Sequence, residues 1–144
     1  MKERFYMPAN DKTMVVVREW VAKAENDLKS AAHLLTMKDC PVDNVCFNAQ
    51  QCVEKYLKAL LITQGLMFPK THDLGELLVL LPVRLRPSLD DQEQDRLTDY
   101  ATVTRYPGDY ERILVTEARQ AVKIARRVRH EVRKLLAKKP LFDL

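Results

Sequence analysis

The chain has 144 residues, of which 47% are hydrophobic and 31% charged, and only 3 are glycine. This composition excludes a wholly disordered chain and fits a globular protein with its own core. No apolar run is long enough to cross a membrane, and none follows the early charges as in a signal peptide. The net charge of +4 is too small to indicate nucleic-acid binding by itself, although basic residues gather near the C-terminal end.

One domain is expected over residues 1–144, with a core over about 15–137 and a loose N-terminal arm over 1–13. The three cysteines, Cys40, Cys46 and Cys52, cannot all pair with one another, and without an export signal we expect reduced thiols in the cytoplasm. No zinc-binding spacing and no glycine-rich phosphate loop is present. We therefore expect no metal and no cofactor.

Two long helices are predicted from apolar stripes with spacings of three and four residues. The first spans about 15–37, and its stripe comprises Val17, Val21, Ala24, Leu28, Ala31 and Leu35. The second spans about 43–64, with Asp43 as its cap and Gly65 as its stop. Its stripe comprises Cys46, Ala49, Val53, Tyr56 and Leu60, widened by Phe47, Leu57 and Leu61. This second helix is expected to be the most buried.

A narrow polar strip runs along the second helix, formed by Asn44, Asn48, Gln51, Lys55 and Lys58. Glu54 precedes Lys58 by four residues, a spacing that favours an ion pair on a helix. The strip therefore supplies cationic and amide groups on an otherwise apolar helix.

Three further helices follow. A short one is expected over 72–81 with Thr71 as its cap, and another over 90–103 after a weak capping box of Ser88 and Asp91. The last spans about 116–137, with a stripe formed by Leu114, Ala118, Ala121, Ala125, Val128, Val132 and Leu135. The short connections predict an all-α fold, an antiparallel up-and-down bundle of four main helices plus one short helix.

Two groups of residues suggest binding chemistry. The last helix carries many cations, Arg119, Lys123, Arg126, Arg127, Arg129, Arg133, Lys134, Lys138 and Lys139, which form either a solvated face or a contact with phosphates. The turn before it reads Arg105-Tyr106-Pro107-Gly108-Asp109-Tyr110. Its guanidinium suits phosphate and its tyrosines suit stacking or hydrogen bonding, although the tyrosines of a purely structural turn would pack on the bundle end.

Four segments of this chain together resemble the HEPN domain (higher eukaryotes and prokaryotes nucleotide-binding). They lie at Trp20–Leu28, Cys46–Leu61, Pro69–Leu74 and Arg105–Tyr110, and the resemblance covers about residues 20–136. It implies a bundle of four core helices plus a short one, often dimeric, and frequent pairing with a small nucleotidyltransferase. Many such pairs look like toxin–antitoxin modules in which the HEPN member cleaves RNA.

The RNA-cleaving members carry an Arg followed, after four to six residues, by a His. Arg105 lies in the matching region, but Tyr110 stands where the His would follow. Tyrosine is a poor general base near neutral pH because its ordinary pKa is about 10. His72 is the alternative partner, approaching from another loop, although a lone His at a helix start is more often structural.

The leading hypothesis is a module that binds a nucleotide or RNA phosphate and acts with a nucleotidyltransferase partner. Arg105, Tyr106 and Tyr110 would form its site, and Gln51, Lys55 and Lys58 would add polar groups and positive charge. The alternatives are a ribonuclease toxin that uses Arg105 with His72 or Tyr110, and a non-catalytic dimeric scaffold. A homodimer is expected, on the argument that the second helix has more apolar surface than one bundle covers.

Overall fold

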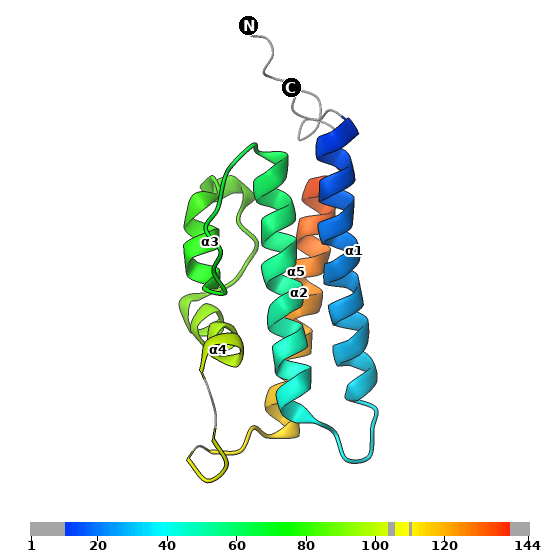
Figure 1. Ribbon diagram of the computed structural model, residues 1–144, viewed down its shortest axis with the longest axis vertical. Coiled ribbons are helices and arrows are strands. Elements are labelled where there is room, and N and C mark those ends of the chain that lie inside the picture. The colour runs from blue at the N-terminus through cyan, green and yellow to red at the C-terminus, as the bar shows by residue number, and fades with distance from the viewer. Residues whose placement is uncertain (1–10, 104–105, 110, 139–144) are drawn as a thin grey trace, which may run out of the picture.

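The structure is a computed structural model, and it describes residues 11–103, 106–109 and 111–138. Within these residues it contains no strand, and its α-helices pack into one bundle (Figure 1). The elements are α1 (Asp11–Leu34), α2 (Val42–Thr63), α3 (Leu74–Leu80), the 3-10 helix η1 (Val83–Leu85), α4 (Asp91–Thr102) and α5 (Val115–Leu136). The predicted all-α fold, with four main helices and one short helix, is confirmed.

Helix α2 is the central helix of the bundle. It contacts α1, α3, α4 and α5, and in Figure 1 it stands between α1 on one side and α3 and α4 on the other. The connection between α1 and α2 is short, so the two helices run antiparallel side by side. Helix α5 then returns alongside α2 after the chain has passed through α3 and α4.

The predicted apolar stripes supply most of the core. All five stripe residues of α2 are buried, as are Val17, Ala24, Leu28 and Ala31 of α1. On α5 the small residues Ala118, Ala121 and Ala125 are buried. Because an alanine side chain adds little width, these positions let α5 approach α2 closely.

Helix α1 begins four residues earlier than the apolar pattern suggests. It starts at Asp11, so residues 11–13 belong to the helix rather than to the expected arm, and it ends at Leu34. Residues 1–10 of that arm lie outside the described residues. An exposed first turn needs no apolar side chain, so the apolar pattern does not mark the residue at which this helix begins.

The helix caps of α2, α3 and α4 differ from those predicted. Pro41 precedes α2 and no side chain caps that helix, so Asp43 lies inside the first turn. Asp73 rather than Thr71 caps α3, accepting a hydrogen bond of 3.2 Å from the amide of Glu76. A full capping box of Asp90 with Glu93 opens α4, in place of the pair Ser88 and Asp91.

Two apolar side chains that were predicted to pack in the bundle are exposed. Phe47 keeps 43% of its surface accessible and Leu114 keeps 65%. Both lie on segments at the end of the bundle where α2 and α5 begin, so no further helical turn covers them (Figure 1). None of the described helices is both long and apolar enough to span a membrane.

We expect Ala125→Leu to destabilise the fold, because the added carbons would push α5 away from α2. Overpacking of this kind costs about 2 kcal/mol. Urea unfolding followed by circular dichroism measures the loss, and Ala22→Leu at an exposed position of α1 serves as the matched control. Equal stability of the two variants would contradict close packing at Ala125.

Candidate functional site

The turn that was predicted to bind phosphate lies at the end of the bundle where α5 begins (Figure 1). Tyr106 is 64% exposed, and its carbonyl accepts a hydrogen bond of 3.0 Å from the amide of Asp109. Gly108 has a φ of 89°, a left-handed conformation that glycine adopts without strain. Arg105 and Tyr110 lie outside the described residues. The turn therefore offers at least one accessible aromatic ring.

Helix α5 directs its N-terminus toward the same end of the bundle. Leu114 precedes the helix, and no side chain caps its first turn. The first amide groups of a helix carry a partial positive charge and bind phosphates readily. Arg112, which is exposed, adds a guanidinium just before this turn of helix. The bundle end thus combines amide donors, a cation and an aromatic ring.

Each predicted ligand residue on the polar strip of α2 already has a partner. Lys55 forms an ion pair of 2.6 Å with Asp27, and Lys58 forms one of 2.8 Å with Glu54. The side-chain amide of Gln51 donates to the side-chain oxygen of Gln50 over 2.7 Å. A ligand at this strip would have to replace these contacts. The expected pair between Glu54 and Lys58 is confirmed.

Glu54 is the centre of a buried polar cluster. Its side chain is only 4% exposed, and its oxygens bind the Lys58 ammonium, the Nδ1 atom of His72 at 2.8 Å and the Nε2 atom of Gln50 at 3.1 Å. Gln50 also donates to the main-chain carbonyl of His72 over 3.0 Å. The cluster therefore holds the segment before α3 against α2. Gln50 is a buried polar residue that the apolar stripe of α2 did not indicate.

The charge state of Glu54 follows from these contacts. Burial alone would raise the pKa of Glu54. Hydrogen bonds from Lys58, His72 and Gln50 lower the pKa by more than burial raises it, so the pKa of Glu54 lies below its ordinary value. The Lys58 ammonium also stands 5.3 Å from the ring centroid of Trp20 and 5.7 Å from that of Phe68. These cation–π contacts join α1 and the loop after α2 to the same cluster.

His72 does not meet the turn. Its side chain is 52% exposed, but its ring is held against Glu54 on α2, ahead of α3. Residues 106–109 lie at the end of the bundle's long axis, well beyond the start of α3 (Figure 1). The structure thus keeps His72 and Lys58 together and separates both from Tyr106.

A second polar cluster joins α1, α2 and α5, and no sequence pattern indicated it. Glu25 accepts hydrogen bonds from the Tyr56 hydroxyl and from Nε of Arg129, the latter at 2.6 Å. Burial would raise the pKa of Glu25, but these two donors hold it below its ordinary value. Burial also raises the pKa of Tyr56 far above its ordinary value, so Tyr56 stays a neutral donor. These contacts fix which face of α5 is turned toward α1 and α2.

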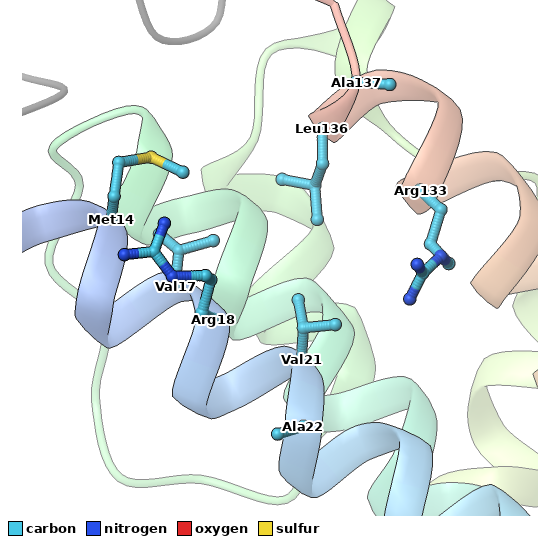
Figure 2. A pocket seen from close by; sticks show the side chains of 8 residues that line it. All are labelled: Met14, Val17, Arg18, Val21, Ala22, Arg133, Leu136 and Ala137. Carbon is cyan, nitrogen blue, oxygen red and sulfur yellow. The ribbon is translucent and has the colours of Figure 1, made fainter.

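An open groove of about 480 Å³ lies between α1 and the C-terminal end of α5. Figure 2 shows the side chains that line it. Its lining is formed by Met14, Val17, Arg18, Val21, Ala22, Arg133, Leu136 and Ala137. The volume is that of a small-molecule site. Its polar lining residues are two arginines, however, and nucleotide recognition needs several convergent donors and acceptors. The groove is therefore not our candidate for a nucleotide.

The three cysteines are free thiols. Cys40, Cys46 and Cys52 form no disulfide, and burial raises the pKa of the Cys52 thiol far above its ordinary value. A thiol of this kind is a weak nucleophile. Across the described ranges, no group of three or more histidine, cysteine, aspartate or glutamate side chains is placed to hold a metal ion.

The family model described as "HEPN domain" matches residues 17–135, which is most of the chain. This protein belongs to the HEPN domain family.

A solved structure described as an archaeal HEPN homologue, ST0689, is similar to this chain. The two share 27% sequence identity at a TM-score of 0.65, and the match covers 83% of this chain and 97% of that one. A comparison with curated proteins found no match.

We expect Glu54→Gln to destabilise the protein by about 3 kcal/mol at pH 7, because Lys58 would keep its charge in a largely buried position without a carboxylate. The folded-state pKa of Glu54 lies below its ordinary value, so the ionised cluster stabilises the fold at any pH above that ordinary value. Its contribution is lost as the pH falls through the folded-state value.

The measurement is urea unfolding of both proteins from pH 7 down to pH 3. The difference between wild type and Glu54→Gln should shrink in the acidic range, whereas the exposed control Glu19→Gln should match the wild type throughout. A difference that stayed constant down to the lowest pH would show that the carboxylate charge contributes nothing.

Proposed function

We propose that this HEPN-domain protein binds the phosphate of a nucleotide or of RNA at the bundle end that carries the turn. In this proposal Arg105 holds the phosphate, and Tyr106 and Tyr110 stack on a base or donate a hydrogen bond. The observation that carries it is the accessible Tyr106 ring on a turn at the same end of the bundle as the uncapped N-terminus of α5. For Gln51, Lys55 and Lys58 the proposal requires an exchange of partners, since each already binds a neighbouring side chain.

The proposal includes a small nucleotidyltransferase as the partner and a toxin–antitoxin-like role in the cytoplasm, as membership of the family implies. The ribonuclease alternative fits less well with His72 as the second catalytic residue. His72 is bound to Glu54 on α2, whereas residues 106–109 lie at the bundle end where α5 begins. A neighbouring reading frame for a nucleotidyltransferase would support the partner, and growth arrest on expression, relieved by Arg105→Ala, would support the toxin role.

A homodimer through this same bundle end also belongs to the proposal. The predicted apolar arc of α2 gives a second copy no surface to bind, because it is buried inside the bundle apart from Phe47. The support comes instead from exposed apolar side chains on segments that lie toward this end of the bundle. They are Met37, Phe47, Val103, Leu114 and Val115. A symmetric contact here would place two turns close together.

Isothermal titration with ATP, GTP and short RNAs tests the binding site. We expect Arg105→Ala to weaken binding by about tenfold or more, because a charge-assisted contact to phosphate contributes roughly 1.5–3 kcal/mol. Tyr106→Ala should weaken it to a smaller extent. Arg84→Ala removes an exposed arginine from η1 and should leave binding unchanged. Equal binding by Arg105→Ala and wild type would remove the proposed site.

The dimer is tested by sedimentation velocity at several concentrations. We expect Leu114→Glu to shift the protein toward monomer, because it places a charge in the proposed apolar contact. Val83→Glu introduces the same charge at an exposed apolar position near α3 and should leave the association unchanged. A wild-type protein that sediments as a monomer at the highest concentration would contradict the proposal.

A further inference from the structure

The solvent-facing side of α5 carries an unbroken line of basic residues, which we name the α5 stripe. Its members are Arg119, Lys123, Arg126, His130, Arg133 and Lys134, and all of them are exposed. At 100° per residue they fall within an arc of about 100°, opposite the buried alanines and valines of the same helix. The stripe extends along about 22 Å of helix, and no acidic residue of α5 lies in this arc.

The cations of α5 divide into two groups with different environments. At the flanks of the stripe, Arg127 pairs with Glu93 of α4 and Arg129 pairs with Glu25 of α1. These two arginines join α5 to its neighbours. In contrast, among the described residues no carboxylate pairs with the stripe residues Arg119, Lys123, Arg126 or Lys134. These four residues therefore hold positive charge that no described carboxylate neutralises, whereas Arg133 interacts with Glu25 and Tyr56.

The composition of the stripe selects among anionic partners. Protein interfaces are enriched in arginine, which the stripe contains, but they are depleted of lysine and depend also on aromatic and apolar anchors, which the stripe lacks. A membrane-surface helix inserts an apolar face, but the apolar face of α5 is buried in the bundle. Single-stranded nucleic acids bind through aromatic stacking, which this surface lacks. A row of cations alone fits the phosphate backbone of a duplex.

We propose that the α5 stripe binds the phosphate backbone of double-helical RNA, without reading its sequence. The choice of RNA rests on the proposed function, because α5 begins at the bundle end that is proposed to hold a nucleotide or RNA phosphate. One RNA molecule would then contact the turn and continue along the helix. The stripe supplies charge and length, and the turn supplies the aromatic contact.

The test is fluorescence anisotropy with an RNA duplex of about 20 base pairs, titrated at several NaCl concentrations. The test variant is Lys123→Ala with Lys134→Ala, and the control is Lys23→Ala with Lys70→Ala, two exposed lysines on α1 and on the loop before α3. Loss of two phosphate contacts should reduce the slope of log K against log salt by about 1.8 and weaken binding at low salt about tenfold or more. The control pair should change neither quantity.

Several outcomes would overturn the inference. Equal salt slopes for the two variants would exclude the α5 stripe as the contact. Tighter binding to a DNA duplex of the same length would exclude RNA as the preferred occupant, and tighter binding to single-stranded RNA would exclude the duplex. Stripe-dependent binding to anionic vesicles or to an acidic peptide, without binding to the duplex, would exclude nucleic acid.

These experiments distinguish failure of the α5 stripe proposal from failure of the proposed site at the turn. If ATP or GTP binds and depends on Arg105 while the RNA duplex does not bind, then the stripe is wrong and the proposed function stands. If the duplex binds through Lys123 and Lys134 while Arg105→Ala changes nothing, then the stripe stands and the turn is not the site. Circular dichroism of the lysine variants confirms folding, which alanine in a helix should preserve.

Discussion

Burial of α2 on nearly every side is the constraint on which the rest of this structure depends. Fourteen of its 22 residues are buried, and they include Gln50, Glu54 and Lys58 as well as the apolar stripe. No single neighbour can cover so wide a surface, so α1, α3, α4 and α5 must all pack against it. The short helix α3 depends on packing against α2 for its stability, because an isolated helix of seven residues would not be stable in water.

The buried carboxylate of Glu54 on α2 restricts how the neighbouring elements can pack. A carboxylate as buried as that of Glu54 is tolerated only where donors surround it, and the donors come from α2 itself and from the segment before α3. Trp20 and Phe68 then enclose the Lys58 ammonium. A different register of these elements would strand a charge in the interior, which makes the observed arrangement the low-energy one.

The functional proposals follow from what this packing leaves uncovered. The sides of α2 are occupied, so the accessible aromatic ring and the uncapped helix N-terminus lie at one end of the bundle. Helix α5 has one face in the core, two flanks joined by ion pairs to α1 and α4, and one face open to solvent. Phosphate chemistry at the end and along the open face of α5 is therefore compatible with the fold, because neither surface is needed to hold the bundle together.

The sequence by itself determined the number of helices, the apolar stripes, the turn at Pro107 and Gly108 and the pairing of Glu54 with Lys58, because all of these depend on neighbours within one or two helical turns. Only the tertiary structure decided that Phe47 and Leu114 are exposed, that His72 binds Glu54, and that Glu25 meets Tyr56 and Arg129. Glu25 and Arg129 are 104 positions apart, and nothing local distinguishes this arginine from the other cations of α5. Such contacts depend on the rotation and end position of whole helices, which side-chain periodicity does not specify.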